Sequence, residues 1–155
     1  MFRTDIQYVA REVKSSLEAF ELKYERAPST RTAAHLTKRL CYNMGLQSVG
    51  VICVGCDGDL YSVLQSGALI LEEMTVQGSG SGPIMAYCDS HFREDMSREE
   101  CAAFVESALQ LAASRDAHSG GDIQLYLLCA AGAVKLPITA AAKRQADTAK
   151  PFAWR

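Results

Sequence analysis

The sequence predicts an α+β fold in which helices form layers outside an antiparallel sheet. Amphipathic helical patterns open the chain, short apolar runs separated by turns follow, and the same order then repeats. The composition, 48% apolar and 22% charged over 155 residues, is typical of one soluble globular domain. A chain of this length buries about 70% of its unfolded surface, so a substantial core needs neither disulfides nor metal.

Four amphipathic helices are predicted from apolar residues spaced three and four positions apart. They cover about 4–25, 30–43, 83–92 and the segment after 97. Thr4 or Asp5 is expected to cap the first helix, and Ser29 or Thr30 the second, because their side chains can accept from a free backbone N–H. The motif Ser-Arg-Glu-Glu that begins at Ser97 is a capping box and opens the fourth helix.

Six short strands are predicted from apolar runs bounded by turns. They cover 48–55, 60–65, 68–71 and 75–77 before the third helix, and 122–129 and 133–138 after the fourth. Asp57-Gly58 is expected to turn the first hairpin, because glycine supplies the positive φ of a tight turn. The strongly apolar strand 122–129 is expected to be buried.

Charge and hydropathy exclude several classes of protein. Sixteen Lys and Arg against eighteen Asp and Glu give a formal net charge of -2, so no general basic field attracts nucleic acid or an anionic membrane. No apolar run reaches the roughly 18 residues of a transmembrane helix. The first residues include charged side chains and lack an unbroken apolar stretch, so no secretory signal is expected. The predicted location is therefore intracellular.

The six cysteines are scattered among apolar residues and are expected to be free thiols. Cys53 and Cys56 have redox or half-zinc spacing, but no second pair completes a zinc site, so buried packing is the expected role. His35, His91 and His118 are too dispersed for a metal site. No metal and no cofactor are expected.

Two glycine-rich loops permit more than one interpretation. Gly-Ser-Gly-Ser-Gly at 78–82 could cradle phosphate at a helix N-terminus, but it lacks the Walker lysine, so a close-packed turn is expected. Asp-Ala-His-Ser-Gly-Gly at 116–121 holds an acid, an imidazole and a hydroxyl. A free-standing triad is not expected there, because side chains so close in sequence rarely converge in triad geometry.

Five features follow one another between 78 and 128. They are a Gly-Ser-Gly turn that enters a helix, a Tyr and an Asp late in that helix, the motif Arg-x-x-Met-Ser-x-Glu-Glu, and Arg-Asp-x-x-Ser-Gly-Gly before an apolar strand. In this order and spacing they resemble the second half of a proteasome beta subunit. Upstream, 21–43 and 50–63 resemble that family's two helices and its hairpin with a Gly-x-Asp turn. The Glu-Glu-Cys and Leu-Cys-Tyr details favour the class of the caspase-like subunit.

The resemblance covers about 4–138 and implies the four-layer αββα fold of N-terminal nucleophile hydrolases. In that family a threonine exposed by propeptide cleavage attacks the peptide carbonyl, and its own α-amine manages the proton. Carried over by motif, Ser79 and Ser119 would hydrogen-bond around the threonine amine, and Asp116 would hold Ser119 and balance the amine's proton. Backbone N–H groups of Gly80 and Gly120 would tighten the two turns.

The resemblance also implies that the nucleophilic threonine, its strands, the lysine and the oxyanion-hole glycine precede the helix that begins near Thr4. The sequence as written is therefore expected to lack the nucleophile and the opening strands, and to be inactive and unable to fold alone. Thr4 is not expected to replace the nucleophile, because it would lie at a helix cap. Leu36 stands 32 positions later, where the family's lysine would follow.

The resemblance thus predicts a beta-ring subunit of the 20S proteasome core, with a partial beta-subunit domain over 1–138 and a weakly structured tail over 139–155. Its expected partners are the other beta subunits of a heptameric ring, the alpha ring and the opposite beta ring, and its substrate is unfolded polypeptide. The implied location is the cytoplasm and nucleus, with no nucleic-acid or membrane partner. Two alternatives stay open: a non-catalytic assembly or interaction module, and an active threonine peptidase whose gene model starts too late.

Overall fold

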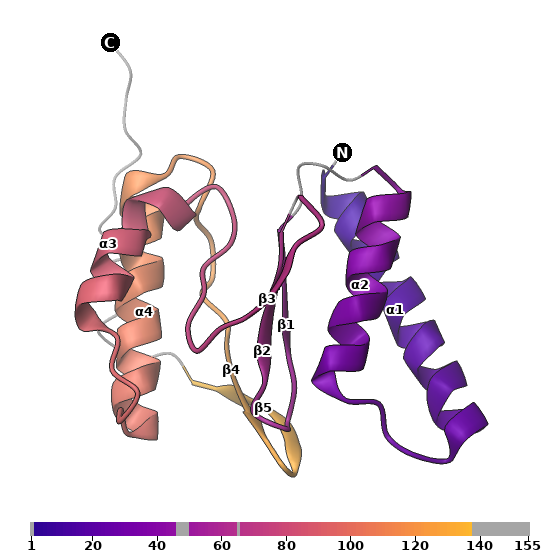
Figure 1. Ribbon diagram of the computed structural model, residues 1–155. Coiled ribbons are helices and arrows are strands. Elements are labelled where there is room, and N and C mark those ends of the chain that lie inside the picture. Colours follow the sequence, from indigo (N-terminus) through magenta and orange to yellow (C-terminus); the bar gives the residue numbers. More distant parts are fainter. Residues whose placement is uncertain (1, 46–49, 65, 138–155) are drawn as a thin grey trace. The chain divides into compact units, whose positions relative to one another are not determined.

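The chain contains both helices and strands in the predicted α+β order. The computed structural model describes residues 2–45, 50–64 and 66–137. Within these ranges the order is α1, α2, β1, β2, β3, α3, α4, β4 and β5 (Figure 1). They form two compact units, 2–77 with 128–132, and 78–127 with 133–137. The predicted unstructured tail at 139–155 lies outside the described residues.

Helices α1 (Phe2–Tyr24) and α2 (Thr30–Asn43) open the first unit. The expected cap at Thr4 or Asp5 is wrong: α1 already begins at Phe2, because no helix-breaking residue precedes Thr4. The cap of α2 is confirmed at Ser29, whose Oγ accepts the Thr32 N–H at 3.3 Å.

Strands β1 (Val51–Val54), β2 (Leu60–Val63) and β3 (Leu69–Leu71) form an antiparallel sheet in the order β1-β2-β3. Helix α2 packs on this sheet, and the central strand β2 is the most buried of the three. The strand expected at 75–77 is wrong. Thr75 instead contacts the sheet by its side chain, with Oγ1 2.7 Å from the Oγ of buried Ser62.

The β1–β2 turn is tied to the first turn of α2. Gly58 has φ 88°, as predicted for the Asp-Gly turn. Asp57 accepts the Thr30 N–H at 3.0 Å through Oδ2 and the Thr30 hydroxyl through Oδ1. These bonds from Thr30 lower the pKa of Asp57 below its usual value. A Cβ at Gly55 would overlap the Thr30 hydroxyl, so the close approach requires glycine.

The second unit contains the helical hairpin of α3 (Ser81–His91) and α4 (Arg98–Arg115), which lie side by side (Figure 1). Its buried apolar residues recur on one face of each helix, as the apolar spacing predicts. They are Ile84 and Cys88 on α3, and Phe104, Ala108 and Ala112 on α4. The ring of Phe104 lies 6.0 Å from that of Tyr87 and 6.1 Å from that of Phe92, so aromatic contacts close the hairpin.

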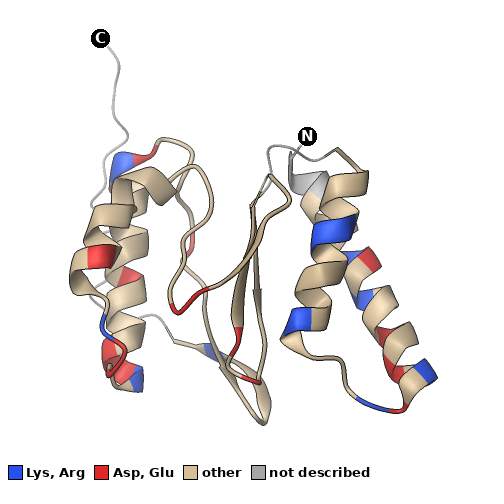
Figure 2. Cartoon of the chain, in the orientation of Figure 1, with Lys and Arg blue, Asp and Glu red and all other residues tan. Residues whose placement is uncertain are grey.

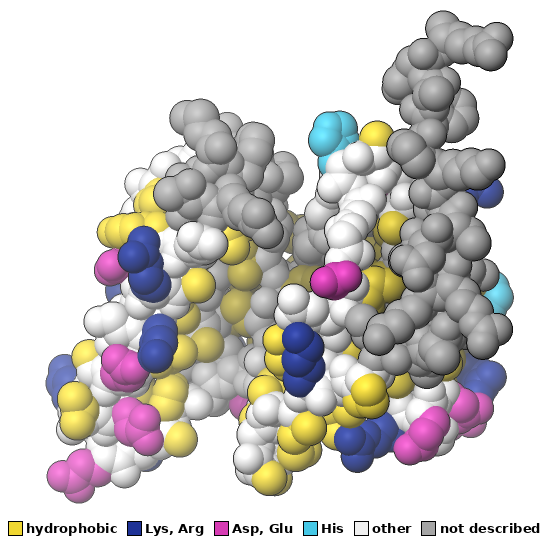
Figure 3. Space-filling model, turned by 180° about the vertical axis from the view of Figure 1, so that it is seen from behind, with side chains coloured by type: hydrophobic (Ala, Val, Ile, Leu, Met, Phe, Trp, Pro, Cys, Tyr) yellow, Lys and Arg dark blue, Asp and Glu magenta, His cyan; other side chains and the backbone are white. Residues whose placement is uncertain are grey.

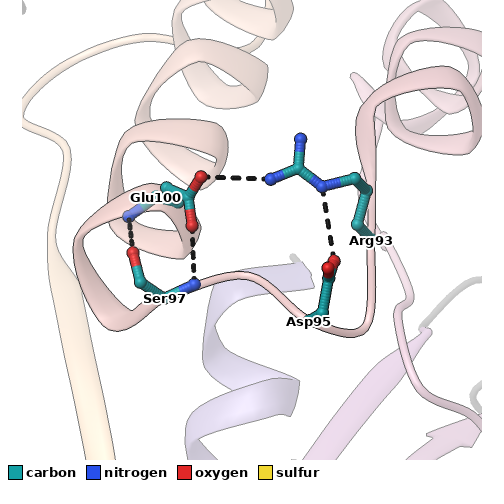
Figure 4. Close-up of polar contacts among 4 residues, drawn as sticks. All are labelled: Arg93, Asp95, Ser97 and Glu100. Carbon is teal, nitrogen blue, oxygen red and sulfur yellow. Dashed lines mark hydrogen bonds and ion pairs between the residues drawn. The ribbon is translucent and has the colours of Figure 1, made fainter.

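The predicted capping box at the start of α4 is confirmed (Figure 4). Ser97 Oγ accepts the Glu100 N–H at 3.2 Å, and Glu100 Oε2 accepts the Ser97 N–H at 2.8 Å. The guanidinium of Arg93 forms ion pairs with two carboxylates: Nη2 lies 3.1 Å from Glu100 Oε1, and Nε lies 3.4 Å from Asp95 Oδ1. Four neighbouring side chains thus fix where the loop ends and the helix begins.

Strands β4 (Leu125–Cys129) and β5 (Gly132–Leu136) form a two-stranded sheet. The strand predicted at 122–129 begins three residues later than expected and is not buried throughout. Leu125 is buried, but Tyr126 is 55% exposed and Leu128 38% exposed. The reason is that side chains alternate between the two faces of a strand, and a hairpin of two strands covers little of either.

Apolar side chains also remain at the surface of the chain. Leu22 is 84% exposed and Leu71 60% exposed. The space-filling view shows apolar, basic and acidic side chains interspersed rather than one continuous apolar face (Figure 3).

Charged side chains of both signs occur along α1, whereas the charged side chains of α2 are all Lys or Arg (Figure 2). None of the helices in the described part of the chain is long and apolar enough to cross a membrane.

Candidate functional site

The predicted site residues Ser79, Asp116 and Ser119 meet in the second unit, and we call them the Asp116 cluster. Ser79 lies in the turn that enters α3, where the Ser81 N–H donates to the Gly78 carbonyl at 3.1 Å. Asp116 is the C-cap of α4. The Ser119 N–H donates to the Asp116 carbonyl at 3.1 Å, which folds the loop after α4 back onto its cap.

One carboxylate oxygen joins the two loops. The hydroxyls of Ser79 and Ser119 both donate to Asp116 Oδ2, each at 2.6 Å. Ser79 and Asp116 are 37 positions apart in the sequence, so this bond connects the entry of α3 to the exit of α4. The other oxygen, Oδ1, accepts the His118 N–H at 3.3 Å. Short hydroxyl-to-carboxylate bonds of this kind are charge-assisted and stronger than neutral ones.

The hydrogen bonds keep Asp116 ionised far into the acid range. The Ser119 hydroxyl, and after it the Ser79 hydroxyl, lower the pKa of Asp116 from 3.8 to about 2. Burial opposes this shift, and the His118 N–H adds to it. The Asp116 side chain is only 12% exposed, so most of it is shielded from solvent. The neighbouring His118 side chain is 86% exposed.

Gly80 allows the two loops to approach. A Cβ at this position would lie 2.8 Å from Ser119 Oγ and 3.1 Å from Ala112 Cβ, both closer than real Cβ contacts normally are. Gly80 is buried and its φ of -80° is open to any residue, so space and not backbone conformation selects glycine. The expected close-packed turn at 78–82 is therefore observed at Gly80.

The geometry of the Asp116 cluster suits an acceptor site rather than a serine nucleophile. Each hydroxyl donates a hydrogen bond to Asp116, so the lone pairs of the hydroxyl oxygen stay available to accept from a further donor such as an ammonium group. In a catalytic triad the histidine lies between serine and acid. Here Asp116 contacts both serines directly, and His118 Nδ1 approaches Asp116 Oδ1 at 3.6 Å. The predicted absence of a free-standing triad agrees with this arrangement.

The two cysteines with redox spacing lie outside the Asp116 cluster. Cys53 donates to Thr37 Oγ1 at 3.6 Å, and burial raises the pKa of the Cys53 thiol. Cys56 is exposed, so the expected burial of this pair holds for neither fully. All six cysteines are free, and no group of three or more metal-ligating side chains occurs among the residues that the structure describes.

Thr4 lies within α1, and Leu36 lies half-buried on α2. Neither belongs to the unit that holds the Asp116 cluster. The backbone N–H groups expected to tighten the two turns were those of Gly80 and Gly120. The turn bonds of the described loops come from the neighbouring Ser81 and Ser119 instead.

A basic groove on α2 was missed by the sequence reasoning. It has a volume of about 660 Å³ and is lined by the exposed side of α2 and its cap. Three cations, Arg31, Lys38 and Arg39, line it together with His35 and Tyr42. The available signal was the absence of any Asp or Glu between 30 and 43. A second hollow, of about 410 Å³, lies between α1, α2 and β1, and neither includes a member of the Asp116 cluster.

Comparison with known proteins gives one consistent result. The family model "Proteasome subunit" matches residues 2–128. "Probable proteasome subunit beta type-1" of Schizosaccharomyces pombe is 39% identical over 129 residues, which are 80% of this chain and 57% of that protein. "Proteasome subunit beta type-1" of Saccharomyces cerevisiae is 39% identical over 137 residues, 85% of this chain and 63% of that protein.

A third relative, "Proteasome subunit beta type-6" of Dictyostelium discoideum, is 36% identical over 129 residues, 80% of this chain and 60% of that protein. The chain thus spans about three fifths of the length of the curated relatives that it matches. The relatives' names give beta types 1 and 6 and no cleavage preference, so the caspase-like class stays a prediction.

Proposed function

Since the chain belongs to the proteasome subunit family, we propose that it is a beta-type subunit of the 20S proteasome core and takes part in protein degradation. The single observation that carries this proposal is the match to the family model over residues 2–128. The beta-type relatives at 35–39% identity agree with it. Its chemistry would be peptide-bond hydrolysis in the assembled particle, with unfolded polypeptide as the substrate.

The geometry of the Asp116 cluster supports a positioning role for these residues in peptide-bond hydrolysis. An ionised Asp116 with two hydroxyls presents oxygen lone pairs to a donor, which is what a protonated N-terminal amine requires. In the proposal Ser79 and Ser119 orient the amine of a nucleophilic threonine, and Asp116 holds both serines. They are positioning residues, because the attacking hydroxyl belongs to the threonine.

The fold proposal is the four-layer αββα arrangement of N-terminal nucleophile hydrolases. What supports it is the element order, together with the packing of α2 on an antiparallel sheet and of α1 on α2 in the first unit.

The proposed partners are the other beta subunits of a heptameric ring, the alpha ring and the opposite beta ring. The proposed location is the cytoplasm and the nucleus, where eukaryotic proteasomes act. A second candidate function is a non-catalytic module that keeps the fold for assembly. It is favoured by one observation: the pKa of Asp116 is lowered to about 2, so this carboxylate is too weak a base to activate the serine hydroxyls that donate to it, and the Asp116 cluster holds no nucleophile of its own.

The proposal is tested by tagging the full chain in the cells that produce it and isolating the tagged complexes. We expect the tag to enrich alpha-type and beta-type subunits together, in a particle of the size of the 20S core. Recovery of the chain only outside such particles would refute the proposal.

A threonine-directed covalent probe, applied to the same particles, separates the two functions. Labelling of the tagged chain, lost in Asp116→Asn but kept in the matched control Asp122→Asn, would support the catalytic role. A particle that contains the chain but leaves it unlabelled, while its neighbours are labelled, would support the non-catalytic module. Asp122 is a suitable control because it lies in the same loop region, outside the Asp116 cluster.

A further inference from the structure

Two cysteines that take no part in the Asp116 cluster lie where α2 packs on β1 in the first unit. Cys41 belongs to the buried face of α2 and is 7% exposed. Cys53 belongs to β1 and is half-buried. Helix α2 contacts β1 directly (Figure 1). The two thiols are therefore held by different elements but share one packed layer.

The contacts between α2 and β1 bring Cys53 close to Cys41. Cys53 Sγ donates to Thr37 Oγ1 at 3.6 Å. Thr37 and Cys41 are four positions apart and both are buried, so they share one face of the helix. Gly55 lies against the Thr30 hydroxyl, which shows that β1 runs toward the start of α2. Cys53 thus lies about one helical turn from Cys41, measured along α2.

The two thiols also interact electrostatically. Burial raises the pKa of Cys41, and the negative charge of Cys53 raises it further. Burial raises the pKa of Cys53 as well, although the hydrogen bond with Thr37 opposes this. Both groups are therefore protonated at neutral pH. Since the thiolate is the reactive form, the pair stays reduced until an oxidant is supplied.

We propose that Cys41 and Cys53 form a dithiol modification site, which hydrogen peroxide converts into an intramolecular disulfide between α2 and β1. Cys53, the more accessible sulfur, attacks one peroxide oxygen as its thiolate; the O–O bond breaks, water leaves and Cys53 becomes a sulfenic acid. The sulfur of Cys41 then attacks the sulfenic sulfur, and the hydroxyl leaves as a second water with the proton of Cys41. One peroxide thus takes up the two electrons and two hydrogen atoms that the thiols lose.

The disulfide adds a second tie between α2 and the sheet. Thr30 already binds Asp57 at the start of the helix, whereas Cys41 lies in its last turn. To form the disulfide, Cys53 Sγ leaves Thr37 Oγ1, and the bond that it gives up is that of a weak thiol donor. The inference stands on the first unit alone and does not rest on the proposed function. Its failure would leave the role in the proteasome untouched.

The test is mass spectrometry of peptides from the full chain, treated with hydrogen peroxide and then with N-ethylmaleimide to block the remaining thiols. We expect a linked pair of peptides that contain Cys41 and Cys53, lighter than the two reduced peptides by two hydrogen atoms. Dithiothreitol should separate them again. The rate of linkage should rise by up to about tenfold per unit of pH, because the thiolate attacks the peroxide.

Cys56 supplies the competing outcome, because it is exposed and only three positions from Cys53. In urea, where the packing of α2 on β1 is lost, we expect Cys53 to pair mainly with Cys56, since short loops close more readily than long ones. In the folded chain we expect the Cys41–Cys53 linkage to exceed the Cys53–Cys56 linkage by at least about fivefold, since folding holds Cys53 beside α2.

Single substitutions complete the test. Cys41→Ser and Cys53→Ser should each abolish the linkage, whereas the matched control Cys101→Ser removes an exposed thiol of α4 and should keep it. Mapping of the unmodified chain decides the matter even where a variant does not fold. The proposal is overturned if the folded chain yields no Cys41–Cys53 peptide, if Cys53 pairs mainly with Cys56 there, if the linkage is as abundant in urea, or if its rate does not depend on pH.

Discussion

Gly80→Ala is the substitution that tests the geometry of the Asp116 cluster most closely. The added methyl carbon would lie 2.8 Å from Ser119 Oγ, so that hydroxyl must recede by about 0.6 Å to reach the 3.4 Å at which ordinary contacts begin. Its bond to Asp116, now 2.6 Å, can then lengthen to about 3.2 Å, beyond the usual limit of about 3.0 Å for a hydroxyl donor.

The expected consequence is a rise in the pKa of Asp116. The Ser119 hydroxyl is the largest cause of the present shift, so weakening it should move the pKa from about 2 part of the way toward 3.8. The shift should be partial, since Ser79 still donates at 2.6 Å. Carbon-13 NMR of the Asp116 carboxyl, recorded along an acid titration of the full chain, measures this value directly.

The sign of the stability effect follows from linkage. A carboxylate whose pKa is lowered on folding stabilises the fold above its ordinary pKa of 3.8 and loses that contribution as the pH falls toward about 2. Gly80→Ala should therefore be less stable than the unmodified chain at neutral pH, and the difference should shrink in strong acid. Gly82→Ala is the matched control, because a Cβ there meets nothing within 4 Å. An unchanged Asp116 pKa in Gly80→Ala, or an equal change in Gly82→Ala, would refute the reasoning.

Three further predictions concern the other polar contacts. Ser97→Ala should lower the free energy of unfolding by about 1 kcal/mol and the Tm by about 2–4 °C, whereas Ser97→Thr should keep most of the stability in the same thermal melt. Gly55→Ala should lower the Tm more than Gly120→Ala, because its methyl group overlaps the Thr30 hydroxyl while position 120 is open; equal melts would count against the contact. Because hydrogen bonds from Thr30 lower the pKa of Asp57, Asp57→Asn should be destabilised at neutral pH, and urea unfolding should show that difference disappearing as the pH falls below 3.8; a pH-independent difference would exclude the carboxylate as its cause.

Local patterns explain most of what the sequence predicted correctly. The Ser97 capping box and the Ser29 cap involve residues three positions apart, so the sequence contains all of their information. The Asp57-Gly58 turn is equally local, since the positive φ at Gly58 depends on residue type. What these residues bond to over longer distances was not predictable in this way. The bond from Thr30 to Asp57 crosses 27 positions and depends on how α2 packs on the sheet.

The Asp116 cluster illustrates the same division. Its three members were identified by resemblance to a family, because no residue spacing relates Ser79 to a loop 37 positions later. That both serines share a single oxygen of Asp116 emerged only from the structure. Strand pairing was the weakest part of the prediction: the run at 75–77 has strand-like residues but pairs with no strand in the described residues. The basic face of α2 was overlooked because apolar spacing draws attention to the buried side of a helix.

The most direct test of the central claim is a cryo-electron microscopy map of particles isolated through a tag on this chain. We predict that residues 2–128 occupy one position of a beta ring, with Ser79 and Ser119 both bonded to Asp116 and facing a threonine amine. A map in which the chain is missing from the ring, or in which Asp116 contacts neither serine, would contradict it.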